Sequence, residues 1–363
     1  MLTEHFHNTQ KDTGHYSNDL RYVLSLQNTI AAFEEIKTWE GYAKTPLHSL
    51  DSMASDIGVK NIYYKDESSR FGLGSFKALG GTYGVLKFIH HALKKEIGDE
   101  VSMKDIHAGK YSEQISKYTV TTATDGNHGR SVAFGAKLFG CKCQIYIHSE
   151  VSSGRQKAME DLEATVNRVS GNYDESLQIC IEDAGKNNWY VISDTSYEGY
   201  TKYPRYIMAG YNVMAEEIID QIKDRPLPTH VFLQGGVGSF PGAICGYFWE
   251  KFPGNNIKFV VVESEHAPCL IRSAQNNQMT SVNIKQETMM AGLSCGEPSL
   301  LGWEILKSGT DDFITINDSS IPGLMRLLAK NNLKIEAGES SVAGLAGLIE
   351  SMEDQKIAEA MEL

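Results

Sequence analysis

The chain has 363 residues, of which 41% are hydrophobic and 22% charged, within the usual range of globular proteins. At about 150 residues per domain, this length predicts about two domains. The formal net charge of -12 at pH 7 argues against a nucleic-acid or anionic-membrane partner, because phosphate binding requires clustered Lys and Arg. We therefore expect a soluble protein that acts on small molecules.

The N-terminal residues and the cysteines favour a cytoplasmic protein without a metal site. No stretch resembles a signal peptide, and no segment reaches the roughly 18 consecutive apolar residues of a membrane span. The cysteines do not form a disulfide framework, and Cys141-Lys142-Cys143 has no matching pair for zinc. A contact between Cys269 and Cys295, which both fall in turns with glycine and proline, stays open on the sequence alone.

The first part of the chain predicts mixed structure. We expect a helix over residues 31–40, an extended segment at 45–47, where Pro46 disfavours helix in the preceding residue, and a strand over 59–65. After Lys77 apolar residues recur at spacings of three and four, which predicts a helix. Strands and helices then alternate, with strands predicted at 118–123, 144–148, 165–169 and 190–194, and helices at 131–139, 155–163 and 173–186.

The second half continues in the same style, with segment 267–301 left unassigned. We expect helices over 208–222 and 322–331 and strands over 229–233, 258–263 and 312–316. Alternation of this kind implies parallel sheets with helices on their faces. The prediction is an α/β fold of two open, mostly parallel twisted sheets flanked by helices. Residues 85–194 would form a small domain, and residues 1–84 and 195–363 a large domain whose sheet takes in an N-terminal strand.

A lysine within a glycine-rich loop is the first candidate for chemistry. The stretch 64–81 reads YKDESSRFGLGSFKALGG, with Lys77 between two pairs of glycines. Glycine lets the backbone bend sharply and lets a ligand approach closely. A lysine partly removed from water has a lowered pKa and can act as a nucleophilic amine. The alternatives are a lysine that forms a Schiff base and an ordinary exposed lysine at a helix start.

A second glycine-rich loop follows the strand predicted at 229–233. Consecutive backbone N–H groups at the start of a helix form an anion site, and a side chain there would block a phosphate. The loop lacks the Lys-Ser/Thr ending of a nucleotide P-loop and the spacing of a dinucleotide fingerprint, so a small phosphate monoester fits better than ATP or NAD. A tight turn without a ligand is the alternative for this loop, Gly235, Gly236, Val237, Gly238 and Ser239.

A polar turn and an isolated acid follow two other predicted strands. Asp125, Asn127 and His128 lie just after the strand 118–123, and Asp194 closes the strand 190–194. Because ligands bind beyond the carboxyl ends of parallel strands, we expect these loops to converge on one cleft. The turn amides would hold a substrate carboxylate and Asn127 would donate to a cofactor oxygen. A plain capping turn, and for Asp194 a turn former, are the alternatives.

A lysine, a phosphate site and a polar loop together describe a pyridoxal phosphate site. At this point the chain resembles the fold-type II pyridoxal-phosphate enzymes, the group of threonine dehydratase and the tryptophan synthase β subunit. It is most similar to the diaminopropionate ammonia-lyase family. The resemblance runs from about residue 20 to 350 and rests on the strings KDESSRFGLGSFKALGG, ATDGNHGRSVA, SDTSYEGYTKYP followed by IMAGY, QGGVGSFPGA, VESEHAPC and EAGESS.

The resemblance implies a role for each matching residue. Lys77 would bind the cofactor as a Schiff base and remove the α-proton of one enantiomer. Asp125 would act as the base for the opposite enantiomer or protonate the departing ammonia, and Asp194 would help to recognise a substrate amino group. Asn127 would lie near the cofactor O3′, and the loop 235–239 would hold the phosphate. The substrate would contact Thr124, Asp125, His128 and Asp194.

The implied activity is that of a lyase of amino-acid degradation: α,β-elimination of D- and/or L-2,3-diaminopropionate to pyruvate and two ammonia by a homodimer. A β-ammonium leaves as neutral ammonia, so the site needs carboxylates near the β-nitrogen, as Asp125 and Asp194 provide. A serine or threonine dehydratase, an amino-acid racemase, and a non-catalytic carrier of the cofactor are the alternatives. Related enzymes end with a strand and a polar loop that pairs with the pyridine nitrogen. Either this sequence is truncated, or Ser340 or Ser341 takes the place of the group that pairs with the pyridine nitrogen.

Overall fold

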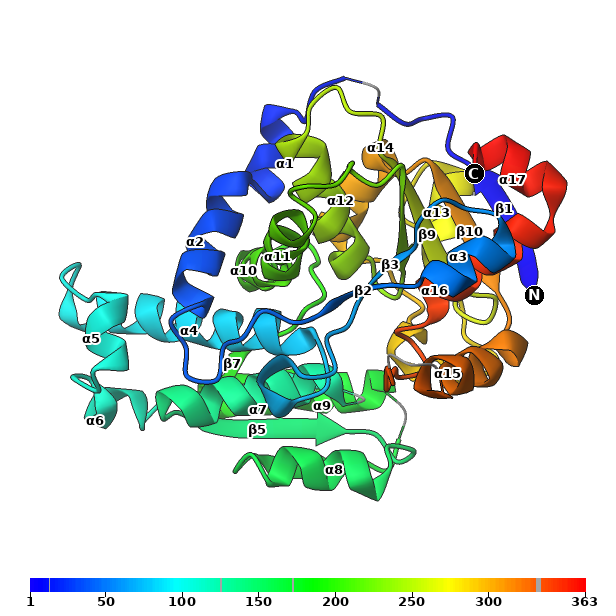
Figure 1. The fold of residues 1–363 in the computed structure, drawn as a ribbon. Coiled ribbons are helices and arrows are strands. Elements are labelled where there is room, and N and C mark those ends of the chain that lie inside the picture. Colours follow the sequence, from blue (N-terminus) through cyan, green and yellow to red (C-terminus); the bar gives the residue numbers. More distant parts are fainter. Residues whose placement is uncertain (13, 125, 172, 331–333) are drawn as a thin grey trace.

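Two mainly parallel β-sheets organise the chain, which the computed structural model describes at residues 1–12, 14–124, 126–171, 173–330 and 334–363. One sheet has the strand order β6-β5-β4-β7 and the other β1-β10-β9-β8. Figure 1 shows them in separate parts of the molecule, with β5 among α4, α7 and α8, and β9 and β10 next to α12, α13 and α14. This arrangement confirms the predicted α/β fold class of two mostly parallel sheets flanked by helices.

The first sheet follows the predicted alternation of strand and helix. Its central strand β4 (Thr119–Ala123) is buried throughout, as expected for a β-branched strand of a parallel sheet with covered faces. β4 pairs in parallel with β5 and β7. The other elements of this sheet are β5 (Lys142–Ile147), β6 (Thr165–Arg168), β7 (Tyr190–Val191), α7 (Asn127–Phe139), α8 (Ser153–Glu160) and α9 (Tyr173–Asn187).

The second sheet takes in an N-terminal strand, as expected, but this strand is not the predicted strand 59–65: it lies at residues 2–7, where the sequence predicted none. β1 (Leu2–His7) pairs antiparallel with β10 (Asp312–Ile316). Its histidines alternate with other residues, and His5 and His7 both hydrogen-bond Asp312 Oδ1, at 2.8 and 3.0 Å. An edge strand is held by backbone hydrogen bonds, so its side chains can be polar. The sequence of this segment therefore shows no strand pattern. The remaining elements here are β8 (His230–Gln234), β9 (Lys258–Ser264), α12 (Ser239–Lys251), α13 (Cys269–Asn276), α14 (Leu300–Gly309) and α16 (Ala343–Glu353).

Several predicted boundaries were wrong. The strand expected over 59–65 is limited to β3 (Tyr63–Lys65), which pairs antiparallel with β2 (Leu47–Ser49) apart from both sheets. The helix expected over 208–222 is two helices, α10 (Lys202–Tyr211) and α11 (Val213–Gln221). They meet at Asn212, whose Nδ2 donates to Thr29 Oγ1 at 3.0 Å. The apolar spacing continues through this junction, so periodicity alone joined the two helices.

The remaining helices complete the outer layers. None of the helices in the described ranges is long and apolar enough to cross a membrane. These helices are α1 (Asn18–Val23), α2 (Leu26–Ile36), α3 (Asp51–Ile57), α4 (Lys77–Ile97), α5 (Met103–His107), α6 (Ser112–Ile115), α15 (Ile321–Lys330) and α17 (Gln355–Met361), with short 3-10 turns η1 (Arg70–Gly72), η2 (Ala291–Leu293) and η3 (Asp318–Ser320).

Helix α4 connects the two parts of the fold. It packs against α7 of the first sheet and against α10, and small residues permit both contacts. A Cβ on Gly80 would lie 2.3 Å from a ring carbon of Tyr211, and one on Gly81 would lie 2.4 Å from Ser131 Oγ. The proposed domain boundary at residues 84 and 85 falls inside this helix, so α4 is an element common to both proposed domains. Its first residue is Lys77.

A buried ionic cluster anchors the loop that leads to Lys77. The Arg70 side chain has 0% exposure and donates to both carboxylate oxygens of Glu217 on α11, each at 2.8 Å. It also donates to both oxygens of Glu67 at 2.8 Å and to Ala43 O at 3.0 Å. Lys65 Nζ reaches Glu217 Oε2 at 2.7 Å. These contacts hold the β2–β3 ladder and the glycine-rich loop against α11.

We expect Arg70→Met to destabilise the fold by about 3–5 kcal/mol, because two enclosed carboxylates, Glu67 and Glu217, are then left with the Lys65 ammonium alone. Urea unfolding followed by circular dichroism would measure the loss. Lys157→Ala serves as the matched control, since it removes an exposed pair with Asp161 and should leave the urea midpoint unchanged. Equal midpoints for the two variants would show that the cluster does not anchor the loop.

Candidate active site

Lys77 and Asp194 form an ion pair at the centre of the site. Lys77 Nζ donates to Asp194 Oδ2, and Tyr211 at the end of α10 donates its hydroxyl to the same oxygen at 3.2 Å. The two charged side chains are 25% and 14% exposed. Burial raises the pKa of Asp194, but the positive charge of Lys77 and the hydrogen bonds from Lys77 and Tyr211 more than offset it and hold this pKa well below its usual range. The carboxylate is therefore ionised at neutral pH.

The start of α7 contributes Asn127 and His128 to the site. His128 is 7% exposed; its Nε2 lies 2.8 Å from Ile192 O and its Nδ1 lies 3.7 Å from Asp194 Oδ2. Burial lowers the pKa of His128. Thr124, a predicted substrate contact, uses its hydroxyl to accept from the Gly126 and Gly129 amides, each at 3.1 Å. Asp125 lies outside the described residues.

The second glycine loop joins β8 to α12 beside this ion pair. Ser239 Oγ donates to Asp194 O at 2.6 Å, and Ser299 N donates to Val237 O at 2.6 Å. Gly238 has a φ of 96°, in the region that favours glycine. Gly235 N donates to Val262 O at 2.8 Å, so that amide extends the sheet. The Ser239 and Phe240 amides at the start of α12 have no i−4 partner within the helix, and Pro241 has no N–H, so these two amides are the ones that can face an anion.

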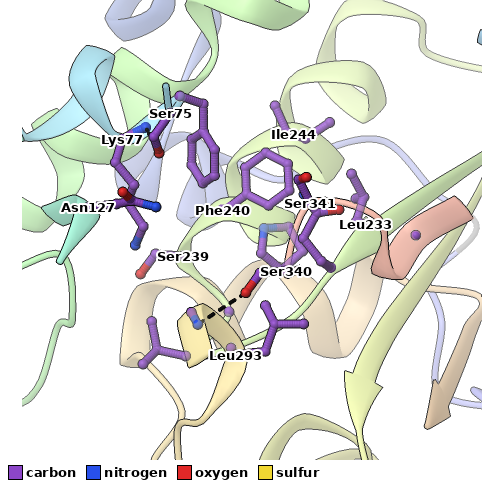
Figure 2. A pocket seen from close by; sticks show the side chains of 18 of the residues that line it. Ser75, Lys77, Asn127, Leu233, Ser239, Phe240, Ile244, Leu293, Ser340 and Ser341 are labelled. Carbon is purple, nitrogen blue, oxygen red and sulfur yellow. Dashed lines mark hydrogen bonds between the residues drawn. The ribbon is translucent and has the colours of Figure 1, made fainter. Parts of the chain in front are cut away.

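A cavity of 1710 Å³ is lined by Lys77, Asp194 and the two glycine-rich loops, while Tyr211 and Gly235 lie behind its wall. Figure 2 shows Lys77 and Asn127 on one side of it, Ser340 and Ser341 on the other, and Phe240 between them. Ser340 Oγ accepts from Gly292 N at 3.1 Å. The structure thus brings Lys77, Thr124, Asn127, His128, Asp194 and the loop from Gly236 to Ser239 to the same cavity.

Two sulfur atoms lie behind the glycine loop. Cys269 donates its thiol to Gly236 O at 3.5 Å, and a Cβ on Gly236 would lie 3.3 Å from Cys295 Sγ. Within the described part of the chain no disulfide joins these cysteines. Gly236 is therefore enclosed on its far side, and Gly292 O, 3.1 Å from the same Cβ position, leaves no room for a side chain.

Comparison with known proteins agrees with this geometry. The family model described as pyridoxal-phosphate dependent enzyme matches residues 38–361. A diaminopropionate ammonia-lyase of Escherichia coli (strain K12) is 38% identical over 312 residues, which are 85% of this chain and 77% of the relative. The chain belongs to the diaminopropionate ammonia-lyase family. A member from Salmonella typhimurium is 36% identical over 355 residues, 94% of this chain and 88% of the relative.

The fold of the family is the fold of this chain. A crystal structure of the E. coli diaminopropionate ammonia-lyase, in complex with an aminoacrylate-PLP azomethine reaction intermediate, matches with a TM-score of 0.87 and 34% identity. The match covers 100% of this chain and 91% of that chain. Members of this family are pyridoxal-phosphate-dependent ammonia-lyases, so the chain is a carbon–nitrogen lyase that uses this cofactor.

The residues present fit pyridoxal phosphate. An amine for the aldehyde is available at Lys77, an amide donor at Asn127, and a helix N-terminus with glycine at 236 and 238 for a phosphate. Tyr211 was missed as a site residue in the sequence because it lies within an amphipathic helical pattern. The feature of the sequence that could have indicated Tyr211 is the IMAGY string, which ends at this residue. Gly210 of the same string packs against α4, since a Cβ on it would lie 2.7 Å from Leu79 O.

We expect Gly238→Ala to weaken pyridoxal phosphate binding about tenfold or more. An alanine at a φ of 96° is strained by about 1–3 kcal/mol, and its Cβ would lie 3.0 Å from Leu270 Cδ2, so the loop must shift. Equilibrium dialysis would measure the dissociation constant of the cofactor. Gly254→Ala is the control, because Gly254 has a φ of 81° and open space around its Cβ position. We expect this variant to change the stability of the fold and to leave the affinity for the cofactor unchanged. Unchanged affinity in both variants would exclude the loop as the phosphate site.

Proposed function

We propose that the protein catalyses α,β-elimination of 2,3-diaminopropionate, D and/or L, to pyruvate and two ammonia. The observation that carries this proposal is the ionised Asp194 at the cavity, already bound to one ammonium, that of Lys77. A substrate that brings its own ammonium to this position satisfies the same carboxylate. A hydroxyl group in its place supplies no positive charge.

The roles of the side chains follow from their chemistry. Lys77, Asn127 and the loop 236–239 would hold the cofactor, which when bound supplies an electron sink for a carbanion at the substrate Cα. Lys77 Nζ takes the α-proton on one face. The bond between Cβ and the β-nitrogen then breaks, and its electron pair leaves with nitrogen as neutral ammonia. Asp194 holds that nitrogen as an ammonium until the bond breaks, which keeps it a good leaving group.

Pyruvate release from D- and L-diaminopropionate, compared with D- and L-serine, tests the proposal. We expect the diamino acid to have the higher kcat/KM, and Lys77→Ala to remove both the activity and the covalent retention of the cofactor seen by mass spectrometry after borohydride reduction. Preferred turnover of serine would favour a dehydratase, and interconversion of enantiomers without pyruvate a racemase. A wild-type protein that binds the cofactor covalently but releases no pyruvate would be a carrier.

We propose that Asp125 is the base for the enantiomer that Lys77 does not serve, because two faces of Cα require two bases. Asp125→Asn is expected to lower kcat for one enantiomer at least tenfold more than for the other, in keeping with the about 10²- to 10⁴-fold contribution of a positioned general base. Separate progress curves for the pure D and L substrates would measure it. Equal losses would exclude the assignment of one base to each enantiomer.

A homodimer in the cytoplasm is part of the same proposal. The acidic composition, with a net charge of -12, supports this proposal only in that it argues against a nucleic-acid or anionic-membrane partner. Size-exclusion chromatography with light scattering would give the mass in solution, against 40.2 kDa for one chain.

A further inference from the structure

His128 presents a fixed hydrogen-bond acceptor to the active site. Its Nε2 lies 2.8 Å from Ile192 O, and because a carbonyl can only accept, Nε2 carries the proton. With burial lowering the pKa of this ring, the imidazole is neutral and Nδ1 holds a lone pair. The side chain is 7% exposed, and Nδ1 has no hydrogen-bond partner among the described residues. A buried acceptor without a partner is costly.

The lone pair of His128 lies near a second acceptor. Nδ1 lies 3.7 Å from Asp194 Oδ2, too far for a direct hydrogen bond and with no proton between them in this tautomer. One ammonium nitrogen can lie at hydrogen-bond distance from both atoms and donate a proton to each. His128 Nδ1 and the Asp194 carboxylate therefore suit the binding of an ammonium group rather than an ion pair with each other.

The other side of Asp194 is fixed in place. Tyr211 donates its hydroxyl to Oδ2 at 3.2 Å and is 0% exposed. Burial raises the pKa of Tyr211 well above its usual value, so the hydroxyl keeps its proton and remains a donor. Ser239 fixes the backbone of the same residue through Asp194 O. The carboxylate cannot turn away from His128 without losing this donor.

Lys77 stands where a ligand cation would bind. Its ammonium is held by Asp194 Oδ2, and the Tyr211 ring centroid lies 5.8 Å from Nζ. When Lys77 Nζ is used to hold the cofactor, Asp194 loses this ammonium, and its carboxylate, 14% exposed, can accept another cation. The β-ammonium of diaminopropionate is such a cation, and the hydroxyl of serine is not.

We propose that His128 is a specificity-determining residue: its Nδ1 and the Asp194 carboxylate, which Tyr211 positions, together bind the β-ammonium of the substrate. This inference rests on the proposed function and names the residues that select its substrate class. It assigns His128 the task of accepting one proton of the ammonium, and assigns Tyr211 that of a positioning residue that acts through Asp194.

The test uses equilibrium binding of two ligands that lack an α-proton and so cannot undergo elimination. These are 2-methyl-2,3-diaminopropionate and 2-methylserine, which differ in the β-substituent alone. Isothermal titration calorimetry on the holoenzyme gives both dissociation constants. We expect the wild type to prefer the diamino ligand, and His128→Gln to weaken that ligand about tenfold or more while changing 2-methylserine less than threefold, since a hydrogen bond to a charged group is lost.

Glutamine is chosen because its amide nitrogen reproduces Nε2 and keeps the bond to Ile192 O while Nδ1 is removed. Tyr211→Phe should shift the preference in the same direction by a smaller factor, because the hydroxyl acts through the carboxylate. Equal weakening of both ligands by His128→Gln would overturn the proposal and leave His128 a structural residue. A wild type without preference for the diamino ligand would instead contradict the proposed function. If His128→Gln does not fold, His128→Asn, which loses the bond to Ile192 O but keeps an oxygen near Nδ1, should retain the preference, and its loss would also overturn the proposal.

Discussion

The ion pair between Lys77 and Asp194 is the contact on which the site depends. It requires that a helix start, a strand end and a second helix start meet at one cavity. Lys77 is the first residue of α4, Asp194 follows β7, and Ser239, which begins α12, donates to the backbone of Asp194. A shift of any one of these elements would leave a charge partly buried and unpaired, and that cost ties the two sheets together at this point.

Close packing makes this meeting of elements rigid. α4 can approach α7 and α10 because Gly80 and Gly81 have no Cβ to collide with Tyr211 and Ser131. The loop before α4 contains Phe71 at a φ of 50° and two glycines of positive φ, a strained path that needs support. Arg70 supplies the support through Glu67 and Glu217. Lys77 thus stands on a helix fixed from both sides, which favours a single orientation of its amine.

The sequence predicted which segments form this site better than it predicted the contacts between their side chains. Parallel strands followed by glycine or polar turns predict a common cleft, and Lys77, Asn127 and the loop 236–239 do lie at one cavity. Tyr211 could not be found in the same way, because a buried tyrosine in an amphipathic helix looks like core until its hydroxyl is seen on a carboxylate. β1 was missed for a related reason: an edge strand is held by backbone hydrogen bonds, and its side chains carry little pattern.

The same physics explains why such a site would discriminate between an amino and a hydroxyl substituent. Attraction alone would provide a modest preference, since a single hydrogen bond to a charged group is worth about 1.5–3 kcal/mol. The free-energy cost of the acceptors that the wrong ligand leaves unpaired contributes more. Asp194 is held ionised by its surroundings, and His128 Nδ1 is an acceptor in the tautomer that Ile192 O imposes. A hydroxyl has one proton and no charge, so it can satisfy one of these acceptors and leaves the other buried without a partner. Sites built to hydrogen-bond a polar group reject an analogue that lacks it by factors on the order of 10⁴, and selectivity of this kind arises from the fixed acceptors of the protein rather than from the size of the cavity.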